Sequence, residues 1–432
     1  MLRKLVCVLG ALLPIALAVQ AQGLNPAEKK LVQSVLARVA AETADLEKVV
    51  NIDSGTFNMA GVREVGRTFQ QELEALGFTT RWIAMPDAMH RAGHLLAERV
   101  AAGGTGKRVL LLGHMDTVFE GQGHRWERKG DTARGAGVTD MKGGGIVVLY
   151  ALKALKEGGL LDSATVRLFF TGDEENPGTP MDVSRRDLVE AARQSDVGLS
   201  FEPTLSGNVV TGRRGLSTWS LQVTGVQGHS SVVLRPKVGA GAIYEAARIL
   251  DGFQAAFSGH PTITVNPGLF LGGTDVTYDA TSSSGASAGK FNVVAKAALV
   301  KGDLRALSDP DREAAKTRMR EIAAANLTRT SAQLDFEDLV PGWPPSDGDK
   351  AVLRLVDAVS RDLDQGPLEA ADPAGRGFGD FNFVCTVIPG VDGLGVKGDA
   401  IHSPDEIVDL TSLGPSTARA AVLISRLLRQ PR

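Results

Sequence analysis

The sequence has few cysteines and no excess of positive charge. Only two of its 432 residues are cysteines, Cys7 and Cys385. Lysine and arginine together (47) do not outnumber aspartate and glutamate (50), so the broad positive surface that binds nucleic acid or an anionic membrane is missing. We therefore expect no nucleic-acid partner.

The first 21 residues differ in kind from the rest of the chain. Arg3 and Lys4 precede a nearly unbroken apolar run over residues 5–18, and small residues stand at the usual cleavage spacing. This pattern predicts a signal peptide, cleaved after Ala21, and export to the periplasm or the medium. A stable membrane anchor is not expected, because the run is shorter than the roughly 20 apolar residues that span a bilayer.

Removal of residues 1–21 would leave Cys385 as the single cysteine and exclude a disulfide bond within the mature chain. Such an exported protein must draw its stability from its hydrophobic core. Cys385 lies in an apolar run, residues 381–388, that predicts a buried strand. We therefore interpret Cys385 as a core residue rather than a nucleophile.

The length and the hydrophobic periodicity predict two domains, because single cores stop growing near roughly 250 to 300 residues. The predicted helices cover residues 27–50, 62–76 and 142–156, and the predicted strands cover residues 80–84, 93–100, 108–112 and 165–170. Helices that alternate with apolar strands indicate an α/β fold with a sheet covered by helices.

The pattern changes after Pro203. Strands are predicted at 217–224, 262–265, 297–304 and 332–336, with helices at 238–253 and 310–325. The order strand-helix-strand-strand-helix-strand is the ferredoxin-like plan, so we predict an inserted α+β domain over residues 213–338. The first domain would comprise residues 22–212 and 339–432, the latter with a helix at 349–362, a strand at 381–388 and a last helix at 411–428. Residues 282–288, all Ser, Gly and Ala, predict a flexible loop.

Histidines and carboxylates stand where predicted strands end. An apolar strand runs directly into His114 and Asp116, and another runs into Glu174 and Glu175. Glu202 repeats the arrangement at a further strand end. In α/β sheets, binding and catalytic groups collect at these carboxyl ends, and adjacent acids that would otherwise repel are stabilised by cations. The alternatives are a histidine that caps a strand and a solvated acidic turn.

Asp140 and His402 complete the set of candidate residues. Asp140 stands at a predicted helix start among glycines, where it is either an N-cap or a carboxylate able to bridge two cations. His402 lies in the segment Gly398 to Glu406, which by itself is a weak signal.

The motifs together resemble the zinc aminoacylase and carboxypeptidase family, which includes the bacterial glutamate carboxypeptidases. The residues that carry the resemblance are His114, Asp116, Asp140, Glu174, Glu175, Glu202 and His402. The resemblance spans essentially the whole mature chain. It implies a zinc-peptidase domain with a mixed sheet, plus the insert as a lid and dimerisation domain.

The resemblance also implies two zinc ions per subunit, with other divalent metals as the alternative. One zinc would bind His114 and Glu202, the other Glu175 and His402, and Asp140 would bridge them. Two histidines and three carboxylates suit zinc.

Glu174 would be the general base, because Glu175 binds metal and leaves Glu174 free to take a proton from water and deliver it to the leaving nitrogen. Asp116 would orient the ring of His114.

Three residues of the insert match the same family. His229, in Gly-His-Ser, would hydrogen-bond the substrate carbonyl oxygen in the transition state, commonly in the active site of the partner subunit. Asn292 and Arg305 would hold the substrate, with the Arg305 guanidinium pairing with a free carboxylate. A structural histidine and an ion pair between Arg305 and Asp303 are the alternatives. The implied assembly is a homodimer formed through the insert.

The chain departs from the family pattern in two places. Residues 274–290 form a longer segment than usual before the Asn-Val-Val motif, and Ala295 replaces the proline of that motif. A Gly-Phe-Gly-Asp sequence ending at Asp380 stands where the family carries Ser or Thr before Asp, and Arg376 beside it is a candidate anion contact. Both places are candidate walls of the substrate pocket.

The predicted activity is cleavage of the amide bond of a C-terminal amino acid in a small peptide or N-acyl amino acid. An N-acyl-amino-acid deacylase or a dipeptidase with the same zinc centre is the alternative within the enzymes. A non-catalytic binding protein on the same fold is disfavoured, because Glu174 and all five ligands are intact.

Overall fold

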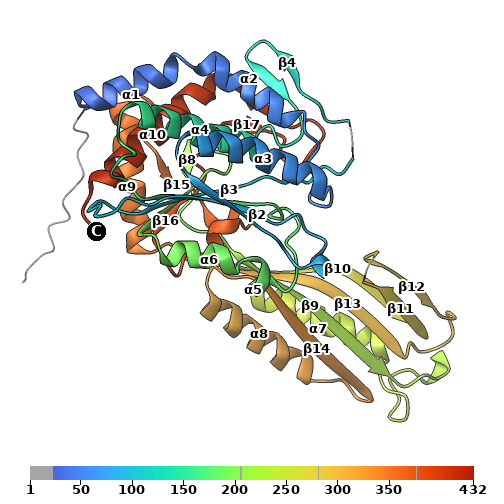
Figure 1. Cartoon of the computed structure of the whole chain (residues 1–432). Helices are drawn as coiled ribbons and strands as arrows, with labels where there is room; N and C mark the ends of the chain where they lie inside the picture. Colours follow the sequence, from blue (N-terminus) through green and yellow to red (C-terminus); the bar gives the residue numbers. More distant parts are fainter. Residues whose placement is uncertain (1–22, 122, 205–206, 281, 376) are drawn as a thin grey trace, which may run out of the picture.

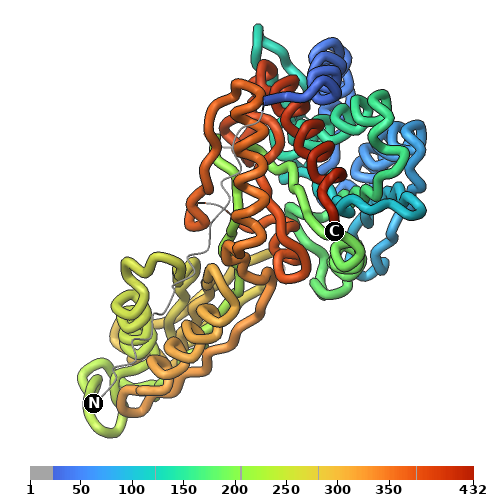
Figure 2. The backbone as a smooth tube through the Cα atoms, turned by 90° about the vertical axis from the view of Figure 1, so that its left-hand side faces the viewer, coloured from blue at the N-terminus to red at the C-terminus, as the bar shows by residue number. Residues whose placement is uncertain are grey.

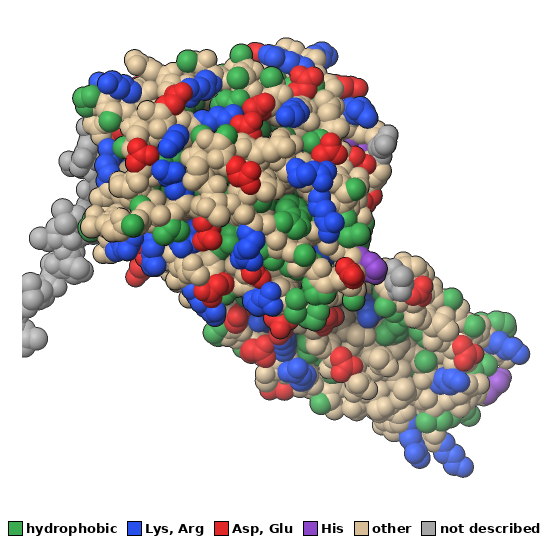
Figure 3. All heavy atoms as spheres, in the orientation of Figure 1, with side chains coloured by type: hydrophobic (Ala, Val, Ile, Leu, Met, Phe, Trp, Pro, Cys, Tyr) green, Lys and Arg blue, Asp and Glu red, His purple; other side chains and the backbone are tan. Residues whose placement is uncertain are grey.

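A computed structural model describes residues 23–121, 123–204, 207–280, 282–375 and 377–432. The predicted signal peptide, residues 1–21, therefore lies outside the described residues. Figures 1 and 2 show a larger lobe of helices around a central sheet and a smaller, elongated lobe that extends from it. On the face drawn in Figure 3, Lys and Arg side chains are interspersed with Asp and Glu. In the described part of the chain, no helix has the length and apolar character needed to cross a bilayer.

The larger lobe is built around a mixed six-stranded sheet (Figure 1). Its strands, in spatial order, are β1 (Thr79–Ile83), β2 (His94–Arg99), β6 (Val166–Thr171), β3 (Val109–His114), β7 (Val197–Ser200) and β16 (Gly390–Val391). β1, β2 and β6 pair antiparallel, whereas β6, β3, β7 and β16 pair parallel. Every residue of β3 and β6 is buried, which explains why these strands read as continuous apolar runs.

Helices cover both faces of this sheet. On one face a single core is shared by α1 (Pro26–Leu36), α2 (Val39–Val50), α3 (Met59–Ala75), α4 (Lys142–Glu157), α9 (Asp347–Asp362) and α10 (Leu413–Arg429). The other face packs against α6 (Arg186–Arg193), which follows the short helix α5 (Met181–Ser184). The α/β class with a mixed sheet covered by helices is therefore confirmed.

The smaller lobe contains a separate four-stranded antiparallel sheet with its own core. The strands are β10 (Ile263–Gly273), β13 (Ala297–Ala306), β9 (Gly215–Gly225) and β14 (Thr330–Val340), and the helices are α7 (Ala242–Phe257) and α8 (Asp309–Ala324). Both the element order along the chain and the strand order β10-β13-β9-β14 are those of the ferredoxin-like plan. The boundaries at residues 213 and 338 stay a prediction.

Short strands complete the fold. They are β4 (Glu127–Lys129), β5 (Thr132–Arg134), β17 (Gly398–Asp399) and β18 (Ile407–Asp409) in one sheet, and the pair β8 (Asn208–Val209) with β15 (Glu369–Ala370). A hairpin of β11 (Asp275–Asp279) and β12 (Ser284–Ala288) projects from the insert.

The strand predicted at residues 381–388 is wrong. The chain there forms a 3-10 turn, Asp380–Phe383, followed by further turns, and the strand comes later, at Gly390–Val391. The run is apolar because Phe381 is fully buried under the sheet, and a short apolar run does not reveal which backbone conformation buries it. Cys385 accordingly lies in a turn and is only partly buried, with Sγ 3.2 Å from the carbonyl oxygen of Asn382.

The flexible loop predicted at residues 282–288 is also wrong over most of its length, because Ser284–Ala288 is β12 and pairs with β11. Two helix boundaries differ for local reasons. The helix predicted from residue 238 starts at Ala242, since Gly239 and Gly241 have φ of +73° and +78°. The helix predicted at 27–50 is interrupted after Leu36 and resumes at Val39.

Candidate metal centre and active site

Three parallel strands bring four of the candidate residues to one edge of the central sheet. β3 lies between β6 and β7, so their carboxyl ends meet. His114 is the last residue of β3, Glu174 and Glu175 follow the end of β6, and Glu202 follows the end of β7. The strand register therefore assembles residues that are far apart in the sequence.

The remaining two candidate ligands arrive from turns rather than from strand ends. Asp140 stands two residues before α4, and its backbone N–H and that of Thr139 donate to Oε1 of Glu406, at 3.0 and 2.8 Å. His402 lies in the turn between β17 and β18, with a φ of +63°. Glu406, which the sequence did not single out, thus fixes the segment that carries Asp140.

The six candidates include two triplets that could each hold a metal ion. His114, Asp140 and Glu202 form one, and Asp140, Glu175 and His402 form the other, with the ligand atoms of each within 4.8 Å of one another. Oδ1 of Asp140 lies 3.2 Å from Nε2 of His114, and Oδ2 lies 3.1 Å from Nε2 of His402. Asp140 therefore belongs to both triplets through different oxygens. These are the two ligand sets that the family resemblance implies.

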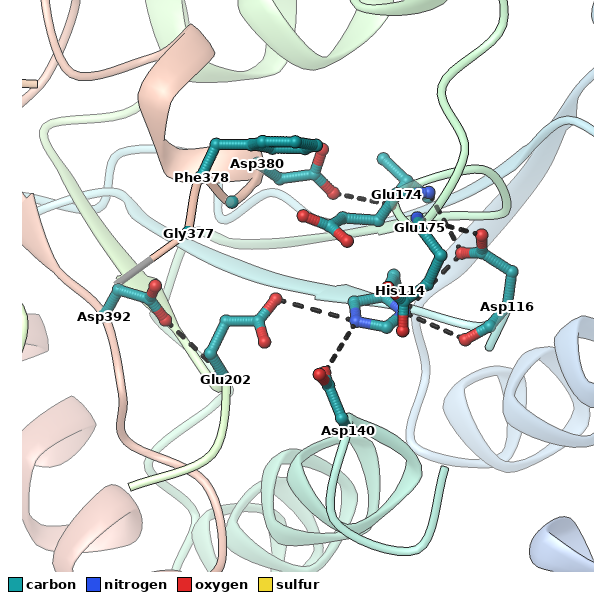
Figure 4. A network of polar contacts seen from close by, with 12 residues as sticks. His114, Asp116, Asp140, Glu174, Glu175, Glu202, Gly377, Phe378, Asp380 and Asp392 are labelled. Carbon is teal, nitrogen blue, oxygen red and sulfur yellow. Dashed lines mark hydrogen bonds and ion pairs between the residues drawn. The ribbon is translucent and has the colours of Figure 1, made fainter. Parts of the chain in front are cut away.

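The charge and burial of the cluster fit bound cations. The carboxylates of Asp140, Glu174, Glu175 and Glu202 converge on two histidines (Figure 4 shows His114 among them), which leaves an excess of buried negative charge. Oε1 of Glu175 is buried and has no hydrogen-bond partner among the described residues. Nitrogen and carboxylate donors of this kind and number fit a pair of divalent metal ions.

The pKa values of the ligands reflect the same excess of negative charge. Burial lowers the pKa of His114, but hydrogen bonds to Asp116 and Asp140 outweigh it and hold the pKa well above its usual value. Hydrogen bonds to Asp140 and Glu175 raise the pKa of His402 to about 10. Burial raises the pKa of Asp140, yet its bonds to the two histidines keep it below its usual value. An environment that favours protonated histidines also favours metal cations, which compete with those protons.

Asp116 acts in two ways, only one of which was expected. Nδ1 of His114 lies 3.0 Å from the backbone carbonyl of Asp116 and 3.5 Å from its carboxylate. A carbonyl only accepts, so Nδ1 carries the proton there and Nε2 is left for a metal. The carboxylate instead accepts from the backbone N–H groups of Glu174 and Glu175, at 3.0 and 3.1 Å (Figure 4). It also accepts from the hydroxyl of Thr56. Asp116 thereby holds the turn that carries both glutamates.

Glu174 and four of the five triplet residues, Asp140, Glu175, Glu202 and His402, line a cavity of about 520 Å³. The cavity is also lined by Arg305 of β13, so it is shared by the two lobes. Burial raises the pKa of Glu174 well above its usual value, with the charge of His114 opposing and the charges of Glu202 and Glu175 adding to the rise. The other lining residues are Val118, Pro203, Arg213, Gly375, Gly377, Phe378 and Ile401.

His229 and Asn292 lie together but elsewhere. The backbone N–H of Ser230 donates to the carbonyl of Asn292 at 2.9 Å, and His229 bridges to Val293. The His229 side chain is exposed, and its Nδ1 lies 2.8 Å from Oγ of Ser231. Among the described residues, neither His229 nor Asn292 lines the cavity, and neither does any residue of 274–290. Of the three candidate residues of the insert, the structure thus brings Arg305 to the cavity within one subunit, but not His229 or Asn292.

Two buried arginines around the site escaped sequence analysis. Arg185 lies 2.6 Å from Asp173 and 2.9 Å from Asp380, and Oγ1 of Thr171 donates to Asp380 at 2.5 Å. The residues of this network come from β6 and the segment after it, from the α5–α6 junction and from the turn after residue 379. No local sequence pattern therefore predicts the network. The candidate contact Arg376 lies outside the described residues.

The second arginine is Arg213. It pairs with Asp392, whose Oδ1 accepts from the backbone N–H of Glu202, and it donates to the carbonyls of Gly377 and Phe378. Arg213 stands just before β9, so it ties the start of the smaller lobe to the wall of the cavity. Its neighbour Arg214 donates to the carbonyl of Ala374, and burial together with the charge of Arg305 lowers the pKa of Arg214.

Comparison with known proteins identifies the family. A model described as peptidase family M20/M25/M40 matches residues 110–426. The chain belongs to this family. The resemblance drawn from the motifs is therefore confirmed, and the protein is a hydrolase of the metallopeptidase and amidohydrolase type.

Two curated M20/M25/M40 relatives illustrate the range of activities. The chain is 28% identical over 409 residues to carboxypeptidase G2 of Pseudomonas sp. (strain RS-16), covering 92% of each protein. It is also 28% identical over 364 residues to a succinyl-diaminopimelate desuccinylase of Bordetella petrii, covering 80% of this chain and 87% of that one.

Solved structures share the fold of this M20/M25/M40 peptidase. Aminopeptidase PepT from Bacillus cereus matches with a TM-score of 0.71 at 19% identity, covering 93% of this chain and 98% of that one. The YXEP protein of Bacillus subtilis, described as a dinuclear metal binding peptidase, matches with a TM-score of 0.64 at 15% identity, covering 91% and 99%.

Proposed function

We propose that this protein is a two-zinc hydrolase that cleaves the amide bond next to a C-terminal amino acid. The observation that carries the proposal is the presence of Arg305 in the same cavity as ligands from both triplets. A metal centre polarises any amide carbonyl placed on it, so selection must come from a group that fixes another part of the substrate. A guanidinium matches a free carboxylate in geometry and charge.

The metals would be held by His114 and Glu202 on one side, by Glu175 and His402 on the other, and by Asp140 between them. The separate contacts of the two Asp140 oxygens support the bridging role, as does the dinuclear description of the Bacillus subtilis protein. When bound, paired zinc ions lower the pKa of water and polarise the scissile carbonyl.

Glu174 is the proton carrier in this proposal. It lines the cavity but belongs to neither triplet, so its carboxylate oxygens are available to accept a proton from the attacking water. Glu174 would hold that proton and then donate it to the leaving nitrogen. Asp116 keeps Glu174 in place through the backbone hydrogen bond at 3.0 Å.

An N-acyl-amino-acid deacylase or a dipeptidase is the alternative. The desuccinylase of Bordetella petrii is as similar in identity as carboxypeptidase G2, although it covers less of the chain. The same metal centre and the same carboxylate anchor serve either reaction, and the acyl group decides between them.

The test is to compare kcat/KM for an N-acyl amino acid and for its C-terminal amide in wild type, Arg305→Ala and Arg305→Lys. Wild type should prefer the acid, and Arg305→Ala should lose about 2 to 5 kcal/mol of that preference, because the substrate carboxylate is left without its charged partner in the cavity. Arg305→Lys should recover part, since a point charge cannot reproduce the planar fork. Equal cleavage of acid and amide by wild type would refute the carboxylate anchor. A panel of acyl groups and dipeptides separates the three hydrolase classes.

We further propose that the enzyme is exported after cleavage behind Ala21 and works as a homodimer joined through the insert. The exposed His229 and the adjacent Asn292 support the dimer, because they lie together on the insert and outside the cavity of their own subunit. A partner subunit would supply them to the site.

A further inference from the structure

We propose that Asp303 is the positioning residue for the substrate anchor, holding the Arg305 guanidinium with its terminal nitrogens free for a carboxylate. The inference rests on the proposed function of Arg305. Nε of Arg305 lies 3.0 Å from Oδ2 of Asp303. No hydrogen bond joins the terminal nitrogens of Arg305 to another described residue. Asp303 thus occupies the Nε edge of the guanidinium and leaves the two terminal nitrogens available to a substrate carboxylate.

The strand geometry makes this pairing possible. Asp303 and Arg305 are two residues apart on β13, so their side chains stand on the same face of the sheet. Ala298, Val300, Leu304 and Ala306 alternate with them and are buried in the core of the insert. The face of Asp303 and Arg305 is therefore the one turned away from that core, and Arg305 reaches the cavity from it.

Asp303 is itself held from the neighbouring strand. Asn266 stands opposite Asp303 in the pairing of β10 with β13, and its Nδ2 donates to Oδ1 of Asp303 at 3.1 Å. The two carboxylate oxygens have separate tasks, one fixed by Asn266 and the other facing Arg305. The backbone of Asp303 is anchored as well, because Nε1 of Trp219 donates to its carbonyl at 3.1 Å.

A second guanidinium makes a carboxylate necessary at this place. Arg214 donates to Thr264, which stands directly opposite Arg305 in the β10–β13 pairing. The charges of Arg214 and Arg305 act on each other, and the charges of Asp303 and Asp372 offset them at Arg214. Without Asp303 the repulsion between the two guanidinium groups would be less offset, and Arg305 would lose the contact that fixes its orientation.

The experiment compares Asp303→Asn with Asp303→Glu and with the control Asp335→Asn in the metal-loaded full-length enzyme. The asparagine keeps an oxygen for Asn266 but offers Arg305 no charge. Asp335 is an exposed carboxylate on β14 of the same sheet, and its hydrogen bond is with Gln333. The substrates are one N-acyl amino acid and its C-terminal amide, and kcat and KM are measured separately.

We expect Asp303→Asn to raise KM for the acid by about tenfold to a hundredfold, with kcat within about threefold, because a displaced anchor costs binding and leaves the metal centre intact. The amide should be cleaved as by wild type, so the acid-to-amide ratio falls. Asp303→Glu should recover part of the loss, and Asp335→Asn should behave as wild type. Melting temperature and metal content should match wild type, because partly exposed ion pairs contribute little to folding.

The inference is overturned if Asp303→Asn retains the wild-type ratio, or if it lowers kcat at unchanged KM. Should Asp303→Asn fail to fold, Asn266→Ala tests the same chain of contacts from one residue further away and should give a smaller rise in KM. Failure of the proposed function looks different, because wild type itself would then not prefer the acid. If Arg305→Ala loses the preference for the acid and Asp303→Asn keeps the wild-type acid-to-amide ratio, only the proposed role of Asp303 is contradicted.

Discussion

Glu174 and Glu175 are adjacent in the chain, yet the structure separates their chemistry. Glu175 joins a triplet with Asp140 and His402, whereas Glu174 belongs to none. Both backbone N–H groups donate to the Asp116 carboxylate, so the turn after β6 is fixed while the two side chains are free to differ.

We predict that Glu174→Gln retains both metals and loses about 10² to 10⁴ in kcat, since an amide neither accepts nor delivers the proton. Elemental analysis checks the metal content, and steady-state kinetics on the same preparation checks kcat. Glu190→Gln, at an exposed position on α6, is the matched control and should leave both unchanged. A rate near wild type in Glu174→Gln would remove Glu174 from the proposed role.

The contact between α2 and α10 contains a buried acid that does not serve the site. Glu42 of α2 is fully buried and accepts a hydrogen bond from the Thr417 hydroxyl of α10, while its other oxygen has no partner among the described residues. Burial raises the pKa of Glu42 to about 7, against the opposing bond from Thr417. An acid whose folded-state pKa is raised contributes stability below its unfolded pKa of 4.5, and that contribution is lost as pH rises through the folded-state value.

Wild type should therefore lose stability between pH 6 and pH 8, and Glu42→Gln should not, because glutamine carries no charge to desolvate. The free energy of unfolding of Glu42→Gln should thus rise relative to that of wild type over this interval. The expected change in this difference is about 1 to 2 kcal/mol, because a shift of one pKa unit corresponds to about 1.36 kcal/mol. Urea unfolding at both pH values in metal-saturated buffer measures it. Glu47→Gln, exposed on the same helix, should show no such change. A difference between Glu42→Gln and wild type that does not depend on pH would contradict the raised pKa.

The two lobes share a cavity, to which the larger lobe contributes the candidate metal ligands and the smaller lobe contributes Arg305, the proposed substrate anchor. Arg213, paired with Asp392 just before β9, joins the two lobes beside that cavity. The relative position of the lobes therefore sets the distance between the metal centre and Arg305.

We predict two zinc ions per chain, and loss of activity in chelator with recovery on addition of zinc. His402→Ala should reduce the content to about one ion, because it removes a ligand from one triplet only. Inductively coupled plasma mass spectrometry on active enzyme provides the count. Active enzyme without any transition metal would refute the metal centre altogether.

The dimer proposal predicts complementation between two inactive variants. Mixed dimers of His229→Ala and Glu174→Gln contain one complete site if His229 acts in the neighbouring subunit, so activity should return to about a quarter of wild type for random exchange. Subunit exchange is verified by differently tagged chains. Exchange without any rescue would show that His229 does not serve the partner.

Much of the site was predictable because its residues stand at the ends of strands and helices, and the apolar pattern of the sequence predicts where those elements end. His114, Glu174, Glu175 and Glu202 follow apolar runs, and the structure places them at one edge of the sheet. The helices, most strands and the order of elements in the insert follow in the same way from periodicity, which reflects local burial. Apolar pattern does not determine backbone conformation, which is why residues 381–388 were predicted as a strand but form a turn.

The sequence by itself determined the residue types of the metal site and the elements that carry them, because strand and helix ends are local properties. Only the tertiary structure decided that the two Asp140 oxygens face different histidines, that the Asp116 carboxylate holds the turn of Glu174, and that the Asp303 carboxylate pairs with Arg305. The physical reason is that these contacts depend on strand register and on the docking of distant segments. Neither has a signature in the spacing of residues along the chain.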